Sequence, residues 1–375
     1  MSSLHCDQKS LIYADFFRYK SRFLTIFLLL SYSYIHTKLT GVYVEATLDQ
    51  FIDFSVRLPY AQRLLVPALA RFFSSLLPLE TFHIFMLLEW LFVTLLYFAL
   101  VHLLSFEFER REAKLLSWLF IILLPLVTVI NYRFDVKGSA PIYFPNDTAS
   151  LFFMALGFLF CLRQSWGYFI AWIFLATFNR ESSVLLLLLI PALHWQHLRE
   201  VIRPFFLAFL AFIAARLIIW FFVHHLPGHM IEWCYFKNFT THFEVNLLRL
   251  IDGQQIFFFL FCMAGLPFFW FVFYDYIPLR YRPIRYVALF YFLGLLVVGN
   301  FVEARIFSEI LILLYLPVCV ALRRWLTRQP SELYQQESGI LFYIDRYAVI
   351  SLLAAVVLLR SPLNKVVIWL SHHLF

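Results

Sequence analysis

Three carboxylates recur at four-residue intervals early in the chain: Glu45, Asp49 and Asp53. On an α-helix, side chains four residues apart share one face. Three carboxylates on one face repel one another, so the pKa of one of them would be raised, which is what a general base working near neutral pH requires. The alternative is an amphipathic helix at a membrane surface, with these acids facing water and Phe51 and Phe54 facing lipid.

Two arginines, Arg57 and Arg63, follow ahead of an apolar run that is short and interrupted by proline. A run of this length does not cross a bilayer, so we predict a horizontal or re-entrant helix in the membrane interface. A guanidinium can bind two oxygens of one phosphate group. The two arginines are therefore candidates to hold a phosphate, and anchoring to lipid headgroups is the alternative.

Asp147 stands at the start of a predicted apolar span, directly after Asn146. An acid or an amide at a helix N-terminus is a routine cap, and capping alone would explain both residues. Asn146 is sufficient for that purpose. Asp147 is therefore a candidate acid for chemistry at the membrane surface.

Two further pairs of ionisable residues interrupt apolar sequence. Arg180 and Glu181 separate two apolar stretches, and Glu303 and Arg305 precede another. Ionisable residues are costly in such surroundings and commonly mark a binding site or a substrate pathway. The structural alternative is local pairing, of Arg180 with Glu181 and of Arg305 with Glu309 four residues later.

The composition places these residues in a membrane protein. Hydrophobic residues make up 62% of the 375 residues and charged residues 14%, whereas soluble domains have about 45–50% apolar and about 25% charged residues. A soluble globular protein is excluded. A transmembrane β-barrel would show alternating segments of about ten residues, and the sequence shows long apolar runs instead. We predict an all-α, polytopic helical membrane protein with about 9–11 transmembrane helices.

Eleven apolar stretches are the candidate spans. Two of them, 167–178 and 183–195, are short and could form one kinked pair around 179–181. The full set is 23–39, 80–105, 115–132, 148–162, 167–178, 183–195, 204–224, 255–274, 286–301, 306–322 and 347–370.

The organisation predicted from these spans is one membrane domain over 1–375. It has a cytosolic N-terminal segment at 1–22, a long outer loop with interfacial helices at 40–79, and a cytosolic connector at 323–346. In this orientation most of the 30 Lys and Arg residues lie in inner segments, as the positive-inside rule requires. The acids and arginines described above then all fall at the outer face, where we expect them to converge.

Several classes of function are disfavoured. The net charge is +7, but the basic residues are scattered singly between apolar spans, so no nucleic-acid partner is predicted. The sequence has no Walker signature or other phosphate-cradling glycine loop, which argues against a nucleotide-driven pump. The five cysteines have no paired metal spacing. We predict no protein metal site; whether a divalent metal ion serves as a cofactor stays open.

The layout and several short motifs resemble the GT-C class of integral membrane glycosyltransferases, which use a sugar carried on a polyprenyl or dolichyl phosphate. The motifs are RLPYAQR at 57–63, YFPNDTAS at 143–150, NRE at 179–181 and EAR at 303–305. The long acid-bearing first outer loop and the Phe- and Leu-rich bundle add to the resemblance. In that class the first-loop acids are often adjacent or separated by one intervening residue, whereas here they are spaced four residues apart.

The resemblance implies inverting transfer of a sugar from a lipid-phosphate donor to an acceptor hydroxyl at the non-cytosolic face. The acceptor would be a glycan, a lipid or a protein, and the membrane would be the bacterial inner membrane or that of the endoplasmic reticulum. The implied roles are catalytic for Asp49, Asp53 and Asp147, donor phosphate binding for Arg57, Arg63, Arg180 and Arg305, and supporting for Glu45, Glu181 and Glu303.

The competing class is a transporter or flippase for a lipid-linked or anionic substrate. It would use the same arginines for binding without turnover chemistry. Its site would lie near the middle of the membrane, where Glu89, Asn131 and Arg216 are the candidate residues. A noncatalytic scaffold is a third possibility, without a positive sign in the sequence.

Overall fold

The computed structural model describes residues 3–130, 142–234, 240–329, 331 and 340–373. These residues form helices, turns and loops, and apart from isolated bridges they contain no β-strand. Several of the helices are long and apolar enough to cross a membrane. The prediction of an all-α, multi-pass membrane protein is therefore confirmed.

The helices follow one another along the chain with short connections. The α-helices are α1 (Ser3–Lys38), α2 (Leu48–Ile52), α3 (Leu65–Leu76), α4 (Thr81–Leu104), α5 (Arg110–Pro125), α7 (Asp147–Leu162), α8 (Trp166–Asn179), α9 (Val184–Leu193), α10 (Leu198–Val223), α11 (His242–Ile251), α12 (Gly253–Cys262), α13 (Leu266–Val272), α14 (Ile284–Val298), α15 (Ser308–Leu326), α16 (Ile340–Leu358) and α17 (Arg360–His373). Short helical turns include η1 (Tyr60–Gln62), η2 (Leu126–Ile130), η3 (Glu181–Ser183), η5 (Tyr274–Tyr276), η6 (Leu279–Tyr281) and η7 (Ala304–Phe307).

Among the described residues, five helical segments have the length and composition of a membrane span. Two bent pairs, α11 with α12 at 94° and most of α16 with α17 at 74°, raise the number to seven if each pair crosses once. Three other predicted spans are shorter apolar helices of 10–17 residues, α7, α8 and the η3–α9 segment. A full crossing takes about 20 residues, so fewer helices meet this criterion than the nine to eleven that the sequence predicts. The five long segments are Thr81–Leu104, Arg110–Ile130, Trp195–Val223, Leu279–Val298 and Ala304–Leu326.

The sequence predicts a break at 179–181 and one unbroken span at 255–274, and the two predictions have different outcomes. The break at 179–181 is present, because α8 ends at Asn179 and Arg180 is extended, with φ −161° and ψ 145°. The predicted span 255–274 is not continuous. Ala264 and Gly265 have φ values of 51° and 67° between α12 and α13, and this left-handed conformation ends a helix. The prediction of one span there is wrong.

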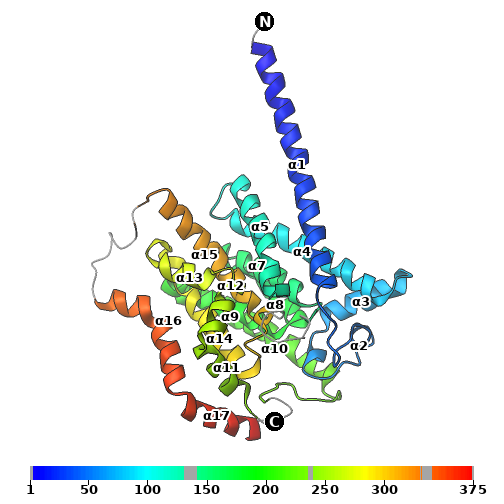
Figure 1. Cartoon of the computed structure of the whole chain (residues 1–375), viewed down its shortest axis with the longest axis vertical. Coiled ribbons are helices and arrows are strands. Elements are labelled where there is room, and N and C mark those ends of the chain that lie inside the picture. Colours follow the sequence, from blue (N-terminus) through cyan, green and yellow to red (C-terminus); the bar gives the residue numbers. More distant parts are fainter. Residues whose placement is uncertain (1–2, 131–141, 235–239, 330, 332–339, 374–375) are drawn as a thin grey trace.

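Helices α7 and α15 form much of the buried centre of the bundle. All residues of α15 from Ser308 to Ala321 are buried, and α4 and α15 both pack against α7. Helix α10 lies outside this centre, and its large apolar side chains face outward, as on a lipid-facing surface. In Figure 1, α1 projects from the body at the top, and α16 and α17 follow its left and lower edges.

The first loop, 40–79, does not place its three acids on one helix face. Thr47 caps α2, in a capping box with Gln50, so this helix begins only at Leu48. Glu45 precedes it, and Asp53 is its C-cap, followed by Phe54 with φ 54°. The predicted common face of Glu45, Asp49 and Asp53 is therefore wrong. The cap at Thr47 decides where the helix begins, and it prevents the longer helix that the four-residue spacing suggests.

The polar contacts between helices gather at two ends of the bundle. Helix α15 connects them: Glu309 is in its first turn, and Arg323 in its last turn contacts Glu112 of α5 at 3.5 Å. Nineteen helical residues span about 28 Å. We call the end at Glu309 the site end and the end at Arg323 the opposite end. Much of the predicted connector 323–346 lies outside the described residues.

Candidate functional site

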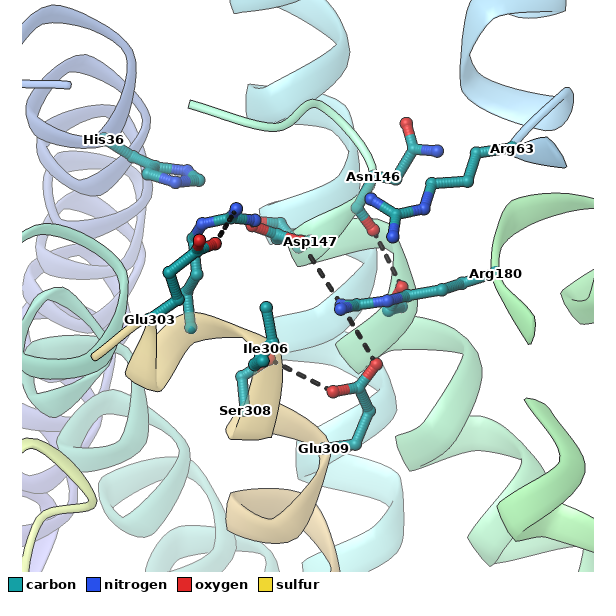
Figure 2. Close-up of polar contacts among 12 residues, drawn as sticks. His36, Arg63, Asn146, Asp147, Arg180, Glu303, Ile306, Ser308 and Glu309 are labelled. Atoms are coloured by element: carbon teal, nitrogen blue, oxygen red, sulfur yellow. Dashed lines mark hydrogen bonds and ion pairs between the residues drawn. The ribbon is translucent and has the colours of Figure 1, made fainter. Parts of the chain in front are cut away.

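The centre of the candidate site is Asp147, the first residue of α7. Arg180 Nη1 lies 3.3 Å from its Oδ1 and Arg305 Nη1 lies 3.1 Å from its Oδ2. The three side chains come from the start of α7, the α8–η3 junction and η7, and Figure 2 shows Asp147 and Arg180 pointing toward each other. All three are buried, with exposed fractions of 1%, 4% and 5%. Residues remote in sequence thus converge at the site end, as the sequence predicts.

Two further carboxylates complete the arrangement. Glu309 Oε1 lies 3.2 Å from Arg180 Nη1, and Glu303 Oε2 lies 2.6 Å from Arg305 Nη2. Ser182 donates a hydrogen bond of 2.7 Å and Tyr291 one of 3.0 Å to Glu309. We call Asp147, Arg180, Glu303, Arg305 and Glu309 the Asp147 cluster. Each of its guanidiniums is shared between two carboxylates.

The local ion pairs that the sequence suggests, Arg180 with Glu181 and Arg305 with Glu309, are not the pairs that the described residues form. Arg180 pairs with Asp147 and Glu309, while the neighbouring Glu181 lies 3.5 Å from Arg63. Glu309 was identified only as a partner for Arg305, and its ion pair with Arg180 was not predicted. The sequence contains a signal for such a pair: Glu309 is a carboxylate one turn inside an apolar helix, where an unpaired charge is costly.

Asparagine side chains hold the two turns of the site together. Asn146 Nδ2 donates to the carbonyl of Asn179 at 3.2 Å, and Asn179 Nδ2 donates to the carbonyl of Asn146 at 3.3 Å. Asn179 Nδ2 also reaches Ser150 Oγ at 2.9 Å. These bonds fix the start of α7 against the end of α8. Asp147 follows Asn146 and Arg180 follows Asn179, so these bonds also set the distance between Asp147 and Arg180.

The first loop reaches the Asp147 cluster through an aromatic stack. Tyr60 is stacked on Phe144, with ring centroids 5.3 Å apart. The guanidinium of Arg305 lies 4.1 Å from the centroid of the Phe144 ring and that of Arg63 lies 5.8 Å from it. Burial raises the pKa of Tyr60, so its hydroxyl stays neutral. Phe144 therefore lies close to both a buried guanidinium and one at the edge of the site.

Arg63 and Glu181 form this edge. The side chain of Arg63 is 11% exposed and that of Glu181 is 48% exposed, and the 3.5 Å separation is long for an ion pair. In Figure 2 the guanidinium of Arg63 points toward Asn146 and Asp147. A loosely paired guanidinium at the edge of a site is the kind of group that an incoming anion can bind.

Arg57 is placed differently from the other three arginines. It pairs with Glu45 and, at 2.7 Å, with Glu232. Partial burial lowers the pKa of Arg57, but the hydrogen bonds with Glu232 and Glu45 raise it above its ordinary value overall. Arg57 thus ties the first loop to the segment after α10. No described contact joins it to the Asp147 cluster.

The two first-loop acids predicted to be catalytic stay apart from the cluster. Asp49 and Asp53 are both exposed. Within the described residues, no hydrogen bond or ion pair joins either side chain to an arginine of the site. The structure therefore brings together Asp147, Arg180, Glu303 and Arg305, with Arg63 and Glu181 at the edge.

A second buried polar group lies directly beside the cluster, and its pairing was not predicted. His36 Nδ1 lies 2.8 Å from Glu89 Oε1, and both side chains are fully buried. Thr148 donates a hydrogen bond to the same carboxylate, and Tyr143 approaches its other oxygen at 3.4 Å. Because Thr148 follows Asp147, one turn of α7 carries residues of both groups.

The other residues named for a transporter lie elsewhere. Arg216 donates to Gln62 Oε1, and Gln62 Nε2 donates to the carbonyl of Met230 at 2.8 Å, which places Arg216 beside the first loop. Asn131 lies outside the described residues. Among those that the structure describes, no three His, Cys, Asp or Glu side chains are arranged to hold a metal ion.

The chemistry open to this site follows from its charges. Asp147 is held between two guanidiniums, which makes it a poor proton acceptor and a good counterion. Arg63, at the edge, can bind an anion that approaches from outside the bundle. Beside Arg180 lies a cavity of about 10 Å³, lined by Ser150, Asn179 and Ser183 among others, with room for about one water molecule.

Comparison with known proteins does not identify a relative: no protein-family model matches the chain, and no curated sequence matches it. The geometry of the site is therefore the basis for a function.

Proposed function

We propose that the protein is an integral membrane glycosyltransferase that moves a sugar from a polyprenyl- or dolichyl-phosphate donor to an acceptor hydroxyl. The observation that supports this best is the grouping of Arg63, Arg180 and Arg305 around Asp147 at one end of a membrane bundle. A lipid-phosphate donor keeps its tail in the bilayer and its phosphate at the membrane surface. A group of guanidiniums at the end of a bundle suits such a molecule.

In this proposal Arg63 binds the donor phosphate and replaces its long contact with Glu181 by bidentate hydrogen bonds to phosphate oxygens. Arg180 and Arg305 are held by carboxylates and stand as fixed hydrogen-bond donors near the leaving group. Asp147 holds both guanidiniums in place, and Glu309 and Glu303 each hold one of them. The site is therefore preorganised before the donor arrives, and Arg63 supplies the positive charge that meets the phosphate.

The transfer step is a direct displacement. The acceptor oxygen attacks the anomeric carbon, and the bond from that carbon to the phosphate oxygen breaks. Its electron pair passes to the phosphate, whose charge the guanidinium of Arg63 stabilises. The hydroxyl proton goes to an oxygen of the departing phosphate, because Asp49 and Asp53, the bases that the resemblance implies, lie apart from the cluster. Inversion at the anomeric carbon follows from this single displacement.

The proposed orientation has a cytosolic N-terminus and the Asp147 cluster at the non-cytosolic face. Its support is the excess of Lys and Arg in the segments that would then be inner loops. The membrane would be the inner membrane of a bacterium or that of the endoplasmic reticulum. The acceptor is a glycan, a lipid or a protein that reaches this face.

Sugar transfer by the purified protein tests the proposal, with radiolabelled hexoses and pentoses on polyprenyl phosphate as donors. We expect Arg63→Gln to lower kcat/KM by about 100-fold, because one stabilising donor to a developing anion is lost. Arg71→Gln is the matched control, since Arg71 is an exposed arginine on α3 that lies over the Phe54 ring. Equal activity of both variants, or no transfer by the wild-type protein from any of these donors, would contradict the proposal.

One observation favours the alternative, a transporter or flippase for an anionic substrate. The pair of His36 and Glu89 is fully buried within the bundle, and buried ionisable pairs of this kind occur in proton relays of transporters. A transporter would move substrate into proteoliposomes in a manner that depends on Glu89 or Arg216. Transfer without such movement favours the glycosyltransferase.

A further inference from the structure

A small cavity lies between α7, α8 and η3, beside Arg180. Its volume is about 10 Å³, which is enough for one water molecule. Three serines of these elements line it, Ser150 of α7 and Ser182 and Ser183 of η3. Asn179, the last residue of α8, lines it as well. We call this space the Asn179 cavity.

The side-chain oxygen of Asn179 needs a hydrogen-bond donor. Asn179 is 0% exposed, and its Oδ1 has no hydrogen-bond partner in the segments that the structure describes. Turning the amide over would not satisfy it, because Nδ2 faces the carbonyl of Asn146, which can only accept. A buried acceptor without a donor costs free energy. A molecule in the cavity that donates to Oδ1 would remove this cost.

Two serine hydroxyls in the wall of the cavity have already used their protons. Ser150 Oγ donates to the carbonyl of Asn146 at 2.9 Å. Ser182 Oγ donates to Glu309 Oε1 at 2.7 Å. A hydroxyl has one proton and two lone pairs. Both oxygens can therefore still accept a hydrogen bond, but neither has a proton left for Asn179.

The third hydroxyl, that of Ser183, has also used its proton. Ser183 Oγ lies 2.9 Å from Thr177 Oγ1, and Thr177 donates its own proton to the carbonyl of Ile173 at 2.7 Å. The proton between the two hydroxyls therefore comes from Ser183. The wall of the cavity thus offers lone pairs, at Asn179 Oδ1 and at the three serine oxygens, rather than hydroxyl protons.

A ligand for this wall must be small and must donate hydrogen bonds. The volume excludes molecules much larger than water, and lone pairs do not attract an anion. A cation is disfavoured because Arg180, which is itself a cation, lines the same cavity. A water molecule has two protons to donate, and buried waters typically make about three hydrogen bonds to polar groups of this kind. Water meets both requirements.

We propose that one water molecule is bound in the Asn179 cavity, where it donates to Asn179 Oδ1 and to a serine oxygen. The water then connects α7, which carries Asp147, with the α8–η3 junction, which carries Arg180. It completes the hydrogen bonds of the turn that brings Arg180 into the Asp147 cluster. The lining of the cavity is the basis of this inference, so it does not depend on the proposed function.

X-ray radiolytic footprinting of the full-length protein in detergent tests the site by comparing methionines. Radiolysis of a bound water produces hydroxyl radicals, which oxidise a side chain in contact with that water even if it is buried. Met154 lines the Asn179 cavity and is 2% exposed, whereas Met263 is 0% exposed and does not line it. We expect Met154 to be oxidised at least fivefold faster than Met263. Equal rates would overturn the proposal.

A third methionine distinguishes a bound water from water that enters from the bulk. Met230, in the segment after α10, is only partly buried, so it reports radicals formed in bulk solvent. A radical scavenger in the buffer should slow the oxidation of Met230 at least threefold and leave that of Met154 unchanged. Loss of Met154 oxidation in the presence of the scavenger would overturn the proposal as well.

A cavity-filling variant provides a second test. Ala176 lines the cavity, so the two methyl groups added by Ala176→Val take the place of the water. We expect the oxidation of Met154 to become at least threefold slower, whereas the matched control Ala171→Val, at an exposed position of α8, should leave it unchanged. An unchanged rate in folded Ala176→Val would overturn the proposal. If this variant does not fold, the comparison of the methionines in the wild-type protein decides.

Discussion

Replacing Asp147 by asparagine is expected to lower the free energy of unfolding by about 3–5 kcal/mol, the usual cost of removing one partner from a buried ion pair. The carboxylate is 1% exposed and contacts both Arg180 and Arg305. Asparagine has nearly the same shape but no charge. Two buried guanidiniums then each lose one carboxylate partner and keep Glu309 and Glu303. Thermal unfolding in detergent measures the loss.

Two comparisons make this prediction specific to the buried charge. Glu200→Gln changes an acid that is 76% exposed and paired loosely with His197, and should cost no more than about 0.5 kcal/mol. Adding Arg305→Gln to Asp147→Asn should cost less than Arg305→Gln costs alone, because the ion pair that the second change breaks is already lost. Stability of Asp147→Asn within about 1 kcal/mol of wild type would mean that water reaches this carboxylate.

The second large effect is expected at Glu89. Glu89→Ala removes the acceptor shared by His36, Thr148 and Tyr143, all of them buried. Each unsatisfied buried donor costs about 1–3 kcal/mol, so we expect a loss of about 3 kcal/mol or more in the same unfolding assay.

Glu89→Gln is the matched control, because its amide oxygen still accepts a hydrogen bond. It should lose less than half as much stability as Glu89→Ala. Similar losses in the two variants would show that the charge of Glu89, rather than its acceptor, stabilises the bundle. The same Gln variant separates the two functional classes, since a transporter that uses Glu89 would stop moving substrate while a transferase would keep its activity.

Much of the helical framework could be predicted from the sequence because apolar length alone sets it. The predicted span 80–105 corresponds to α4, Thr81–Leu104, and 204–224 corresponds to most of α10, Leu198–Val223. The polar residues at 179–181 also end one helix and begin another, as predicted. In these segments hydrophobic burial and local backbone preference favour the same boundary.

The sequence was less informative where local chemistry competes with the pattern. The four-residue spacing of the first-loop acids suggests a helix, but the Thr47 cap starts α2 too late to include Glu45. The apolar run at 255–274 suggests one span, but Ala264 and Gly265 adopt a left-handed conformation and break it. Caps and turns of this kind depend on packing that a periodic pattern does not contain.

Only part of the candidate site could be predicted from the sequence. Topology brings the ends of alternate helices to one face, so the meeting of Asp147, Arg180 and Arg305 could be expected. Tertiary contacts decide which acid pairs with which arginine. The sequence instead suggests pairs of residues that are close along the chain, such as Arg180 with Glu181. Arg180 instead reaches Glu309, more than 100 residues away in the chain. His36 likewise reaches a residue that is not its neighbour, Glu89, 53 residues away.

The central claim is that the guanidiniums at the site end receive the phosphate of a lipid-linked donor. An experimental structure of the protein with a bound polyprenyl phosphate tests it most directly. We predict phosphate oxygens within about 3 Å of the Arg63 guanidinium, beside Asp147 and Arg305, with the polyprenyl chain leaving along the outside of the bundle. A phosphate bound away from Arg63, or the Asp147 cluster dispersed, would contradict the account.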